Sequence, residues 1–388
     1  MSSSGLKLVS LLMVFGVCSY DNQFMQIGIR FILNLLILTY FILGVFYRQI
    51  FRLSKGYLFV LLLILIFCLL GLYSAFNSVI FLKSLFKVYE LCVLIALCYF
   101  LTSRKNFDLI SCFNFSFLGT LAISITSDFL FGTPYLFEIK GLIPLINANT
   151  VGFMAGLMVL INLPKGNKTI IGIASILLFL SGSMTSLILT IFMAIFLLLS
   201  IQKFIILSLS FLILAFFSLD FLVSGEDIET VMLFSGRMLL WERIFDIYVS
   251  EFNFFEGVGL GAGRELNSQF YGGVAKSFHN AYLEVLISLG WLGLLTFIWI
   301  LLYVVYAVRK NLRNYRGIEM ILLLYVIVRA FTSSNLTFVS IDSLIFWSAY
   351  FYSCRKLYFR RDLITKDKYK QQGESVSSNN YTTPKVLP

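Results

Sequence analysis

The sequence predicts an all-α membrane protein, a polytopic bundle of about twelve transmembrane helices. Of its 388 residues 59% are hydrophobic and only 13% are charged, whereas a soluble domain carries roughly a quarter charged residues. A spanning helix needs about 20 apolar residues, so this content allows on the order of a dozen spans. Unbroken apolar runs such as Tyr57–Tyr73 and Phe204–Val223 predict helices, because the strands of a membrane barrel alternate apolar and polar residues.

Hydropathy places the spans in order along the chain. They are predicted at about 5–20, 24–46, 56–76, 78–101, 107–126, 147–163, 168–184, 185–201, 203–223, 278–308, 318–335 and 337–354. The first span has no small-residue cleavage site and is interpreted as retained. Four regions follow: an N-terminal bundle of about nine spans (1–223), a large hydrophilic loop (224–277), C-terminal helices (278–354) and a polar tail (355–388) that is expected to be disordered.

Basic residues orient the bundle, because cytoplasmic connections of membrane proteins are rich in Lys and Arg. They occupy alternate connections: Arg48, Arg52, Lys55, Arg104, Lys105, Lys165, Lys168, Lys203, Arg309, Lys310, Arg313 and Arg316. All fall on one side if both termini are cytoplasmic, which predicts a bacterial inner-membrane protein with the loop 224–277 in the periplasm. The net charge of +10 is thus mainly a topology signal, and no nucleic-acid partner is expected.

Nine basic residues are not explained by this orientation, and they are the candidates for function. They are Arg30, Lys83, Lys87, Lys140, Arg237, Arg243, Arg264, Lys276 and Arg329. Charges within spans are unfavourable and usually face a cavity or a partner. Lys83 and Lys87 share one helix face and either line a site for an anionic headgroup or snorkel, with Glu90 as partner. For Arg329, an internal pair with Asp342 is favoured over direct substrate contact.

The large loop contains an amphipathic segment from Arg237 to Phe252. Its apolar residues recur at helical spacing, and its charged residues decorate the other face. They are Met238, Trp241, Ile244, Phe245 and Tyr248, opposite Arg237, Arg243 and Asp246. The pattern predicts an interfacial helix whose cations meet phosphates. The alternative is a loop helix packed on the bundle with its charges in water.

Two further signals follow this segment. The glycine-rich run Gly257–Gly263 predicts tight backbone turns, with amides that could approach an anion. His279 is the single histidine of the chain and lies at the outer start of a predicted span. An imidazole can accept a proton near neutral pH, although a lone histidine is often structural. Without a cysteine or carboxylate cluster around it, no metal site is expected.

Taken together, these motifs resemble the O-antigen ligase and polymerase superfamily of bacterial surface-polysaccharide assembly. The resemblance rests on the segments Gly236–Trp241, Gly257–Gly261, His279–Glu284 and Gly290–Leu294. A looser match is Leu180–Leu187, preceded by Asn147 and Asn149. Relatives often carry an arginine where this chain has Met184, which weakens a phosphate-binding role for that span end.

The resemblance implies glycosyl transfer at the outer membrane face from an undecaprenyl-diphosphate-linked oligosaccharide. In this interpretation His279 is the base that activates a sugar hydroxyl, and Arg237 stabilises the leaving diphosphate, since guanidinium groups bind phosphate bidentately. The remaining substrate-binding candidates are Arg243, Arg264, Asn280, Lys83, Lys87, Lys276 and Arg329. No cofactor or nucleotide is expected. Membrane lipids are expected partners, and a chain-length regulator is a partner suggested by the family alone.

Three activities are weighed. A polymerase, which transfers the glycan to another lipid-linked repeat unit, is favoured by the Gly-x-Gly-x-Gly run and by the Tyr-Leu-Glu form of the His-Asn motif. A ligase, which transfers it to the lipid A core, shares motifs, size and topology and stays open. A transporter of lipid-linked oligosaccharide is the third reading; it should show duplicated halves and polar sites near the midplane, and the sequence shows no repeat.

Reporter fusions test the predicted orientation. Alkaline phosphatase joined within 224–277 should be active, because that enzyme folds only outside the cytoplasm, and fusions after residue 355 should be inactive. A loop reporter that is active only in the cytoplasm would remove the basis for chemistry on a periplasmic lipid donor.

Overall fold

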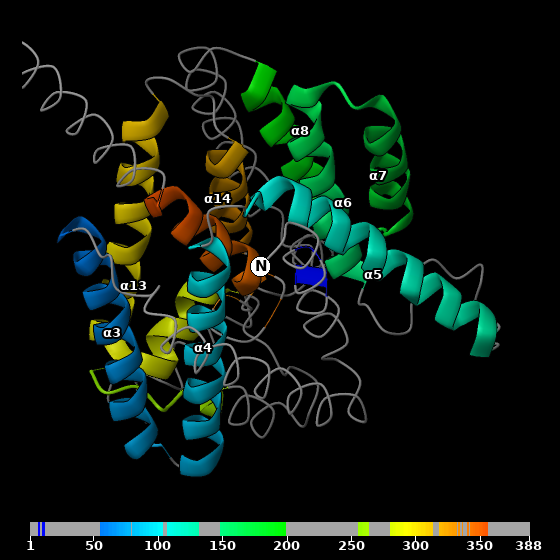
Figure 1. Cartoon of the computed structure of the whole chain (residues 1–388). Coiled ribbons are helices and arrows are strands. Elements are labelled where there is room, and N and C mark those ends of the chain that lie inside the picture. Colours follow the sequence, from blue (N-terminus) through cyan, green and yellow to red (C-terminus); the bar gives the residue numbers. More distant parts are fainter. Residues whose placement is uncertain are drawn as a thin grey trace, which may run out of the picture.

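A computed structural model describes much of the helical part of the chain (Figure 1). The described residues are 55–78, 80–103, 107–131, 148–198, 255–263, 280–312, 318–331 and 342–355, with 7, 10, 11, 333, 336 and 340. Within these ranges the chain forms helices and turns and no strand, as the all-α prediction requires. The predicted spans at 24–46 and 203–223, most of the span at 5–20, and the tail beyond residue 355 lie outside them.

The helices agree with nine of the predicted spans, within a few residues at most ends. These nine helices are α3 (Lys55–Phe76), α4 (Phe81–Thr102), α5 (Leu109–Phe131), α6 (Ala148–Asn162), α7 (Lys168–Leu180), α8 (Met184–Leu198), α13 (Ala281–Leu312), α14 (Ile318–Arg329) and a helix at 342–355. A 3₁₀ turn, η3 (Leu163–Lys165), follows α6. Three of them are long and apolar enough to cross a membrane, at Leu58–Phe76, Phe81–Thr102 and Ala281–Tyr306. The helices α7 and α8 are apolar but shorter.

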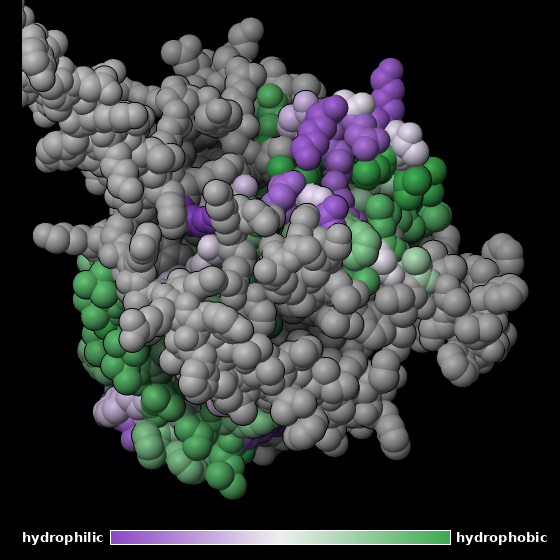
Figure 2. All heavy atoms as spheres, in the orientation of Figure 1, coloured by the Kyte–Doolittle hydropathy of each residue, from purple (hydrophilic) through white to green (hydrophobic). Residues whose placement is uncertain are grey.

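Large apolar side chains remain exposed along several helices, as expected for surfaces in contact with lipid. Those on α3 and α13 include Leu62, Leu65, Leu69, Leu295, Trp299 and Leu302. Figure 2 shows apolar surface at the lower left, over α3 and the α3–α4 end, and hydrophilic surface at the upper right, over the connection from α6 to α7. Together with the long apolar helices, this distribution indicates a membrane protein.

Helix α6 is central, and two glycines allow α8 to approach it closely. A Cβ atom on Gly156 would lie 2.2 Å from Thr190 Oγ1 and 2.6 Å from the Tyr325 hydroxyl. These two hydroxyls are themselves 3.1 Å apart. One turn earlier, a Cβ atom on Gly152 would lie 2.6 Å from the Ser181 hydroxyl oxygen and 2.6 Å from the Ser183 Cβ. Small residues four apart are a common means of close helix packing in membranes, and here they also make room for buried hydroxyl groups.

The division between the spans predicted at 168–184 and 185–201 lies a few residues earlier, in a tight turn at Gly182. Helix α7 ends at Leu180, Gly182 has a φ of 61°, and its amide donates to the Phe179 carbonyl over 3.2 Å. A left-handed glycine directly after a helix satisfies its last carbonyls and reverses the chain. Helix α8 then begins at Met184, so the two helices form an antiparallel pair.

The span predicted as one continuous helix at 278–308 is broken, and this is a correction. Gly290 within α13 has φ 69° and ψ −171°, a conformation that interrupts the helix and that glycine adopts most readily. A short helical piece therefore runs from Ala281 to the break, and a longer apolar piece continues to Leu312. The break leaves carbonyls of the first piece without their usual intrahelical donors.

Substitution of Gly156 by alanine tests the α6–α8 packing. The added methyl group would displace the Thr190 and Tyr325 hydroxyls, so the variant should lose about 1–3 kcal/mol of stability and unfold at a lower temperature in detergent. Gly172→Ala in α7 is the matched control, because a Cβ there meets nothing within 4 Å. Equal unfolding temperatures for the two variants would contradict the close packing.

Candidate functional site

The first turn of α13 carries the predicted His-Asn motif, and Asn280 caps it. The Asn280 side-chain oxygen accepts hydrogen bonds from the amides of Tyr282, at 3.0 Å, and Leu283, at 3.1 Å. Asparagine is among the most favoured N-cap residues, because its short side chain satisfies amides that have no partner inside the helix. The half-buried Asn280 therefore fixes the start of the helix at Ala281. His279, the residue before this cap, lies outside the described residues.

The start of α13 is docked on the end of α14. The amide of Ala281 donates to the Ala330 carbonyl over 2.8 Å, and the Tyr282 hydroxyl donates to the Ile327 carbonyl over 3.0 Å. The ring of Tyr282 also packs against Phe331, with centroids 4.5 Å apart. Two hydrogen bonds and a ring contact on consecutive residues hold the beginning of the motif against one helix end.

The glycine-rich run fills the break in α13. Gly257, Gly259 and Gly261 all have positive φ, at 70°, 96° and 79°, which confirms the predicted tight turns. The amide of Val258 donates to the Ile287 carbonyl over 2.9 Å, and the amide of Gly259 donates to the Ser288 carbonyl over 3.0 Å. In an unbroken helix these carbonyls would accept from residues four positions ahead. The two loop amides thus bind helix carbonyls rather than an anion.

The same glycine run also contacts the connection between α3 and α4. A Cβ atom on Gly259 would lie 2.6 Å from both the Ser78 Cβ and the Ser84 hydroxyl. Those two serine hydroxyls are 2.8 Å apart, and the Ser74 hydroxyl donates to the Ser288 carbonyl. This part of the large loop therefore packs between α13 and the α3–α4 connection, with no space for a side chain at Gly259.

Arg329, at the end of α14, forms the predicted pair with Asp342. Its Nε atom lies 3.2 Å from an Asp342 carboxylate oxygen, and both side chains are buried, at 7% and 3% exposure. Its guanidinium group donates to the Ser186 hydroxyl at 2.8 Å and to the Asn149 carbonyl at 3.2 Å, and it lies 4.2 Å above the ring of Phe153. A buried guanidinium requires such compensation, because desolvation of an unpaired charge is prohibitive.

These contacts connect the looser sequence motif to Arg329. Ser186 belongs to the motif segment Leu180–Leu187, and Asn149 belongs to the segment that precedes it. The Ser186 hydroxyl also accepts a hydrogen bond from Ser183 at 2.9 Å. Met184 carries no charge and is 68% exposed. The guanidinium group at this turn is that of Arg329, from α14.

The two lysines on α4 differ in their surroundings. Lys87 is paired with the buried Glu90, with 2.8 Å between its ammonium nitrogen and a carboxylate oxygen, as one of the two interpretations predicted. Lys83 is exposed in the first turn of α4, next to Ser84, which the glycine run contacts.

One buried carboxylate was not among the predicted site residues, although it ends the His-Asn motif segment. Glu284 is fully buried in the first turn of α13, and its amide donates to the Asn280 carbonyl over 3.0 Å. Acidic residues inside membrane bundles are rare and are usually functional. The sequence feature that could have identified Glu284 is the position of an acidic residue at the start of an apolar run.

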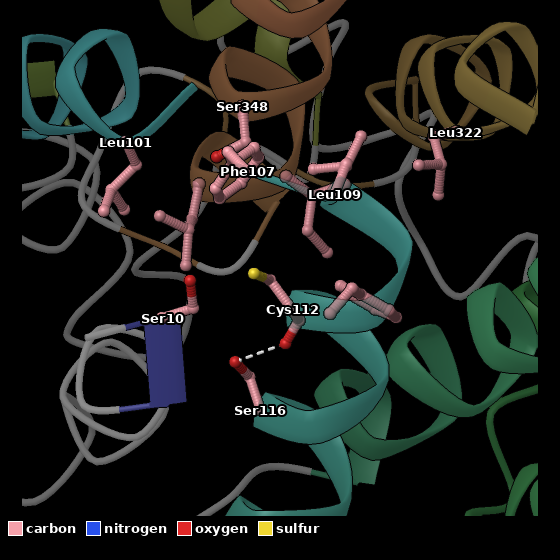
Figure 3. A pocket seen from close by; sticks show the side chains of 11 residues that line it. Ser10, Leu101, Phe107, Leu109, Cys112, Ser116, Leu322 and Ser348 are labelled. Atoms are coloured by element: carbon pink, nitrogen blue, oxygen red, sulfur yellow. Dashed lines mark hydrogen bonds between the residues drawn. The ribbon is translucent and has the colours of Figure 1, made fainter. Parts of the chain in front are cut away.

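An apolar pocket lies away from these polar groups (Figure 3). It is lined by residues from α4, α5, α14 and the helix at 342–355, among them Leu101, Phe107, Cys112, Leu322 and Ser348. Leu101 is near the end of α4, whereas the glycine run contacts its beginning at Ser84. The pocket is therefore not part of the arrangement around the first turn of α13.

The structure brings Asn280, Glu284 and the glycine run together near the first piece of α13, and places Arg329 on the helix end that contacts it. Lys83 lies on the α3–α4 side of the glycine run. The other predicted site residues lie outside the described part of the chain: Arg30, Lys140, Arg237, Arg243, Arg264, Lys276 and His279.

Comparison with known protein families identifies one match. The family model described as O-antigen ligase matches residues 169–298, from α7 to the middle of α13. This region includes the glycine run, the break at Gly290 and the His-Asn motif. No curated protein matches the chain. The family match and the shared motifs support membership of this chain in the O-antigen ligase and polymerase superfamily.

Proposed function

We propose that this protein is an O-antigen polymerase of the bacterial inner membrane. It transfers a glycan from undecaprenyl diphosphate to a sugar hydroxyl of another lipid-linked repeat unit, at the periplasmic face. The observation that carries the proposal is the O-antigen ligase match at 169–298. That region contains most of the candidate residues: Arg237, Arg243, Arg264, Lys276, His279 and Asn280.

The proposed chemistry is a displacement at the anomeric carbon of the donor sugar. His279 accepts the proton of the acceptor hydroxyl, whose oxygen forms the new glycosidic bond as the bond from carbon to the diphosphate oxygen breaks. The leaving diphosphate remains on its lipid, and Arg237, Arg243 and Arg264 neutralise its charge through bidentate hydrogen bonds. The diphosphate ester supplies the driving force, so neither a nucleotide nor a metal is included.

The described geometry supports a site at the start of α13. Asn280, the residue after His279, fixes the helix start at Ala281, and the glycine run joins the large loop to the same piece of α13. The described residues on either side of 264–279, the glycine run and Asn280, are thus held on the same piece of α13. The exposed Lys83, on the α3–α4 side of the glycine run, is suited to a lipid phosphate at the membrane surface.

A ligase is the second candidate, because the matching family model is described as O-antigen ligase and does not separate the two activities. In that case the acceptor is a hydroxyl of the lipid A core, and the donor, the base and the arginines keep the same roles. For either activity we place both termini in the cytoplasm. A chain-length regulator is a proposed partner of the polymerase.

A deletion strain separates these activities. Loss of the polymerase should leave lipopolysaccharide that carries a single repeat unit, because ligation of single units continues. Loss of a ligase should instead leave bare core and accumulate lipid-linked polymer. Gel electrophoresis of extracted lipopolysaccharide distinguishes the two, and an unchanged ladder would contradict both.

His279→Ala should abolish chain extension while delivery of single units to the outer face continues. Removal of a general base lowers the rate by roughly 10²–10⁴-fold, enough to eliminate polymer on a gel. Gly172→Ala, expressed at the same level, serves as the control. Failure of single units to reach the outer face in the His279 variant would favour the transporter interpretation.

A further inference from the structure

Arg329 and Asp342 form a buried ion pair whose place in the fold is close to the His-Asn motif. A buried ion pair is weak evidence for stability, because apolar replacements of similar volume are often neutral or stabilising. The pair is nevertheless surrounded by specific contacts to Ser186 and Asn149. These contacts indicate that the pair has a positional role in addition to any effect on stability.

The pair fixes the last turn of α14 from several directions. Arg329 is bound to the start of α6 through Asn149, to α8 through Ser186, and to the helix at 342–355 through Asp342. Asp342 also accepts a hydrogen bond from the Ser333 hydroxyl at 2.9 Å. Ser333 lies four residues after Arg329, so the connection that follows α14 is bound to the same carboxylate as the arginine.

The residue after Arg329 makes direct contact with the start of α13. The Ala330 carbonyl accepts from the Ala281 amide at 2.8 Å, and the Ile327 carbonyl, two residues before Arg329, accepts from the Tyr282 hydroxyl at 3.0 Å. The residues on either side of the arginine therefore carry the acceptors that seat the motif. A shift of this helix end would displace the first turn of α13 along with Asn280.

We propose that Arg329 and Asp342 are positioning residues: their ion pair sets the location of the end of α14, which seats the first turn of α13 and, through it, His279 and Asn280. This inference rests on the proposed glycosyl transfer and gives Arg329 a role other than substrate binding. Because catalysis depends on sub-ångström placement of the base relative to the acceptor hydroxyl, loss of the pair lowers turnover more than donor binding.

Two readouts on the full-length protein in nanodiscs test the proposal. The first is kcat and KM for transfer, with lipid-linked repeat units extracted from the deletion strain as the probe. The second is hydrogen exchange of the amides of residues 281–283, which the capping and docking contacts protect. Asp342→Asn should lower kcat by at least about ten-fold with KM changed less than about two-fold, and should raise the exchange of these amides.

The variants include a rescue and a matched control. Asp342→Glu retains the charge and should recover most of the lost turnover and protection. Arg355→Lys lies at the other end of the same helix, where Arg355 donates to the Thr102 carbonyl at 2.6 Å, and should change neither readout. If Asp342→Asn does not fold, Tyr282→Phe removes the hydroxyl contact to Ile327 alone and should show the same split between kcat and KM.

The outcomes separate this proposal from the proposed function. Wild-type exchange of residues 281–283 in Asp342→Asn, or raised exchange with unchanged kcat, would overturn the positioning role. An equal loss in Asp342→Glu and Asp342→Asn would also overturn it. If the wild-type protein transfers no glycan while exchange responds as expected, the proposed function is wrong and the mechanical connection between the pair and α13 is supported.

Discussion

The interruption of α13 at Gly290 is the constraint on which the rest of this arrangement depends. A helix that breaks inside an apolar bundle leaves carbonyl groups that water cannot satisfy, and each unsatisfied group is unfavourable by several kcal/mol in a membrane. Here the amides of Val258 and Gly259 and the hydroxyl of Ser74 take up the carbonyls of Ile287 and Ser288. The break in α13 is therefore tolerated because the glycine run and the end of α3 supply the missing hydrogen-bond donors.

A second set of polar contacts lies on the other side of the first piece of α13. Arg329 joins α6, α8, α14 and the helix at 342–355, and its neighbour Ala330 holds Ala281. The first turn of α13 thus lies between two groups of hydrogen bonds that are far apart in sequence. Segments that are more than a hundred residues apart in the sequence, such as those of Asn149 and Asn280, are thereby connected through the end of α14.

The sequence was informative where a physical rule acts locally. Runs of about 20 apolar residues predicted α3 and α4, the glycine-rich run 257–263 predicted tight backbone turns, and the need of a buried charge for a partner predicted the pair of Arg329 with Asp342. The break at Gly290 was not predicted, because the donors that make it tolerable come from residues about thirty positions earlier. For the same reason Asn280 was assigned to substrate before its role as a helix cap was known.

The fit of the glycine run into α13 has a consequence for how members of this superfamily can be recombined. Because Val258 and Gly259 supply donors for α13, the hydrophilic segment is not an independent module that can be transplanted by cutting at its ends. A chimaera that replaces this segment should keep the glycine run of this chain together with its own helix break at Gly290 and with the serines of α3 and α4 that contact them. Junctions placed beyond that matched set would preserve the fold of this chain.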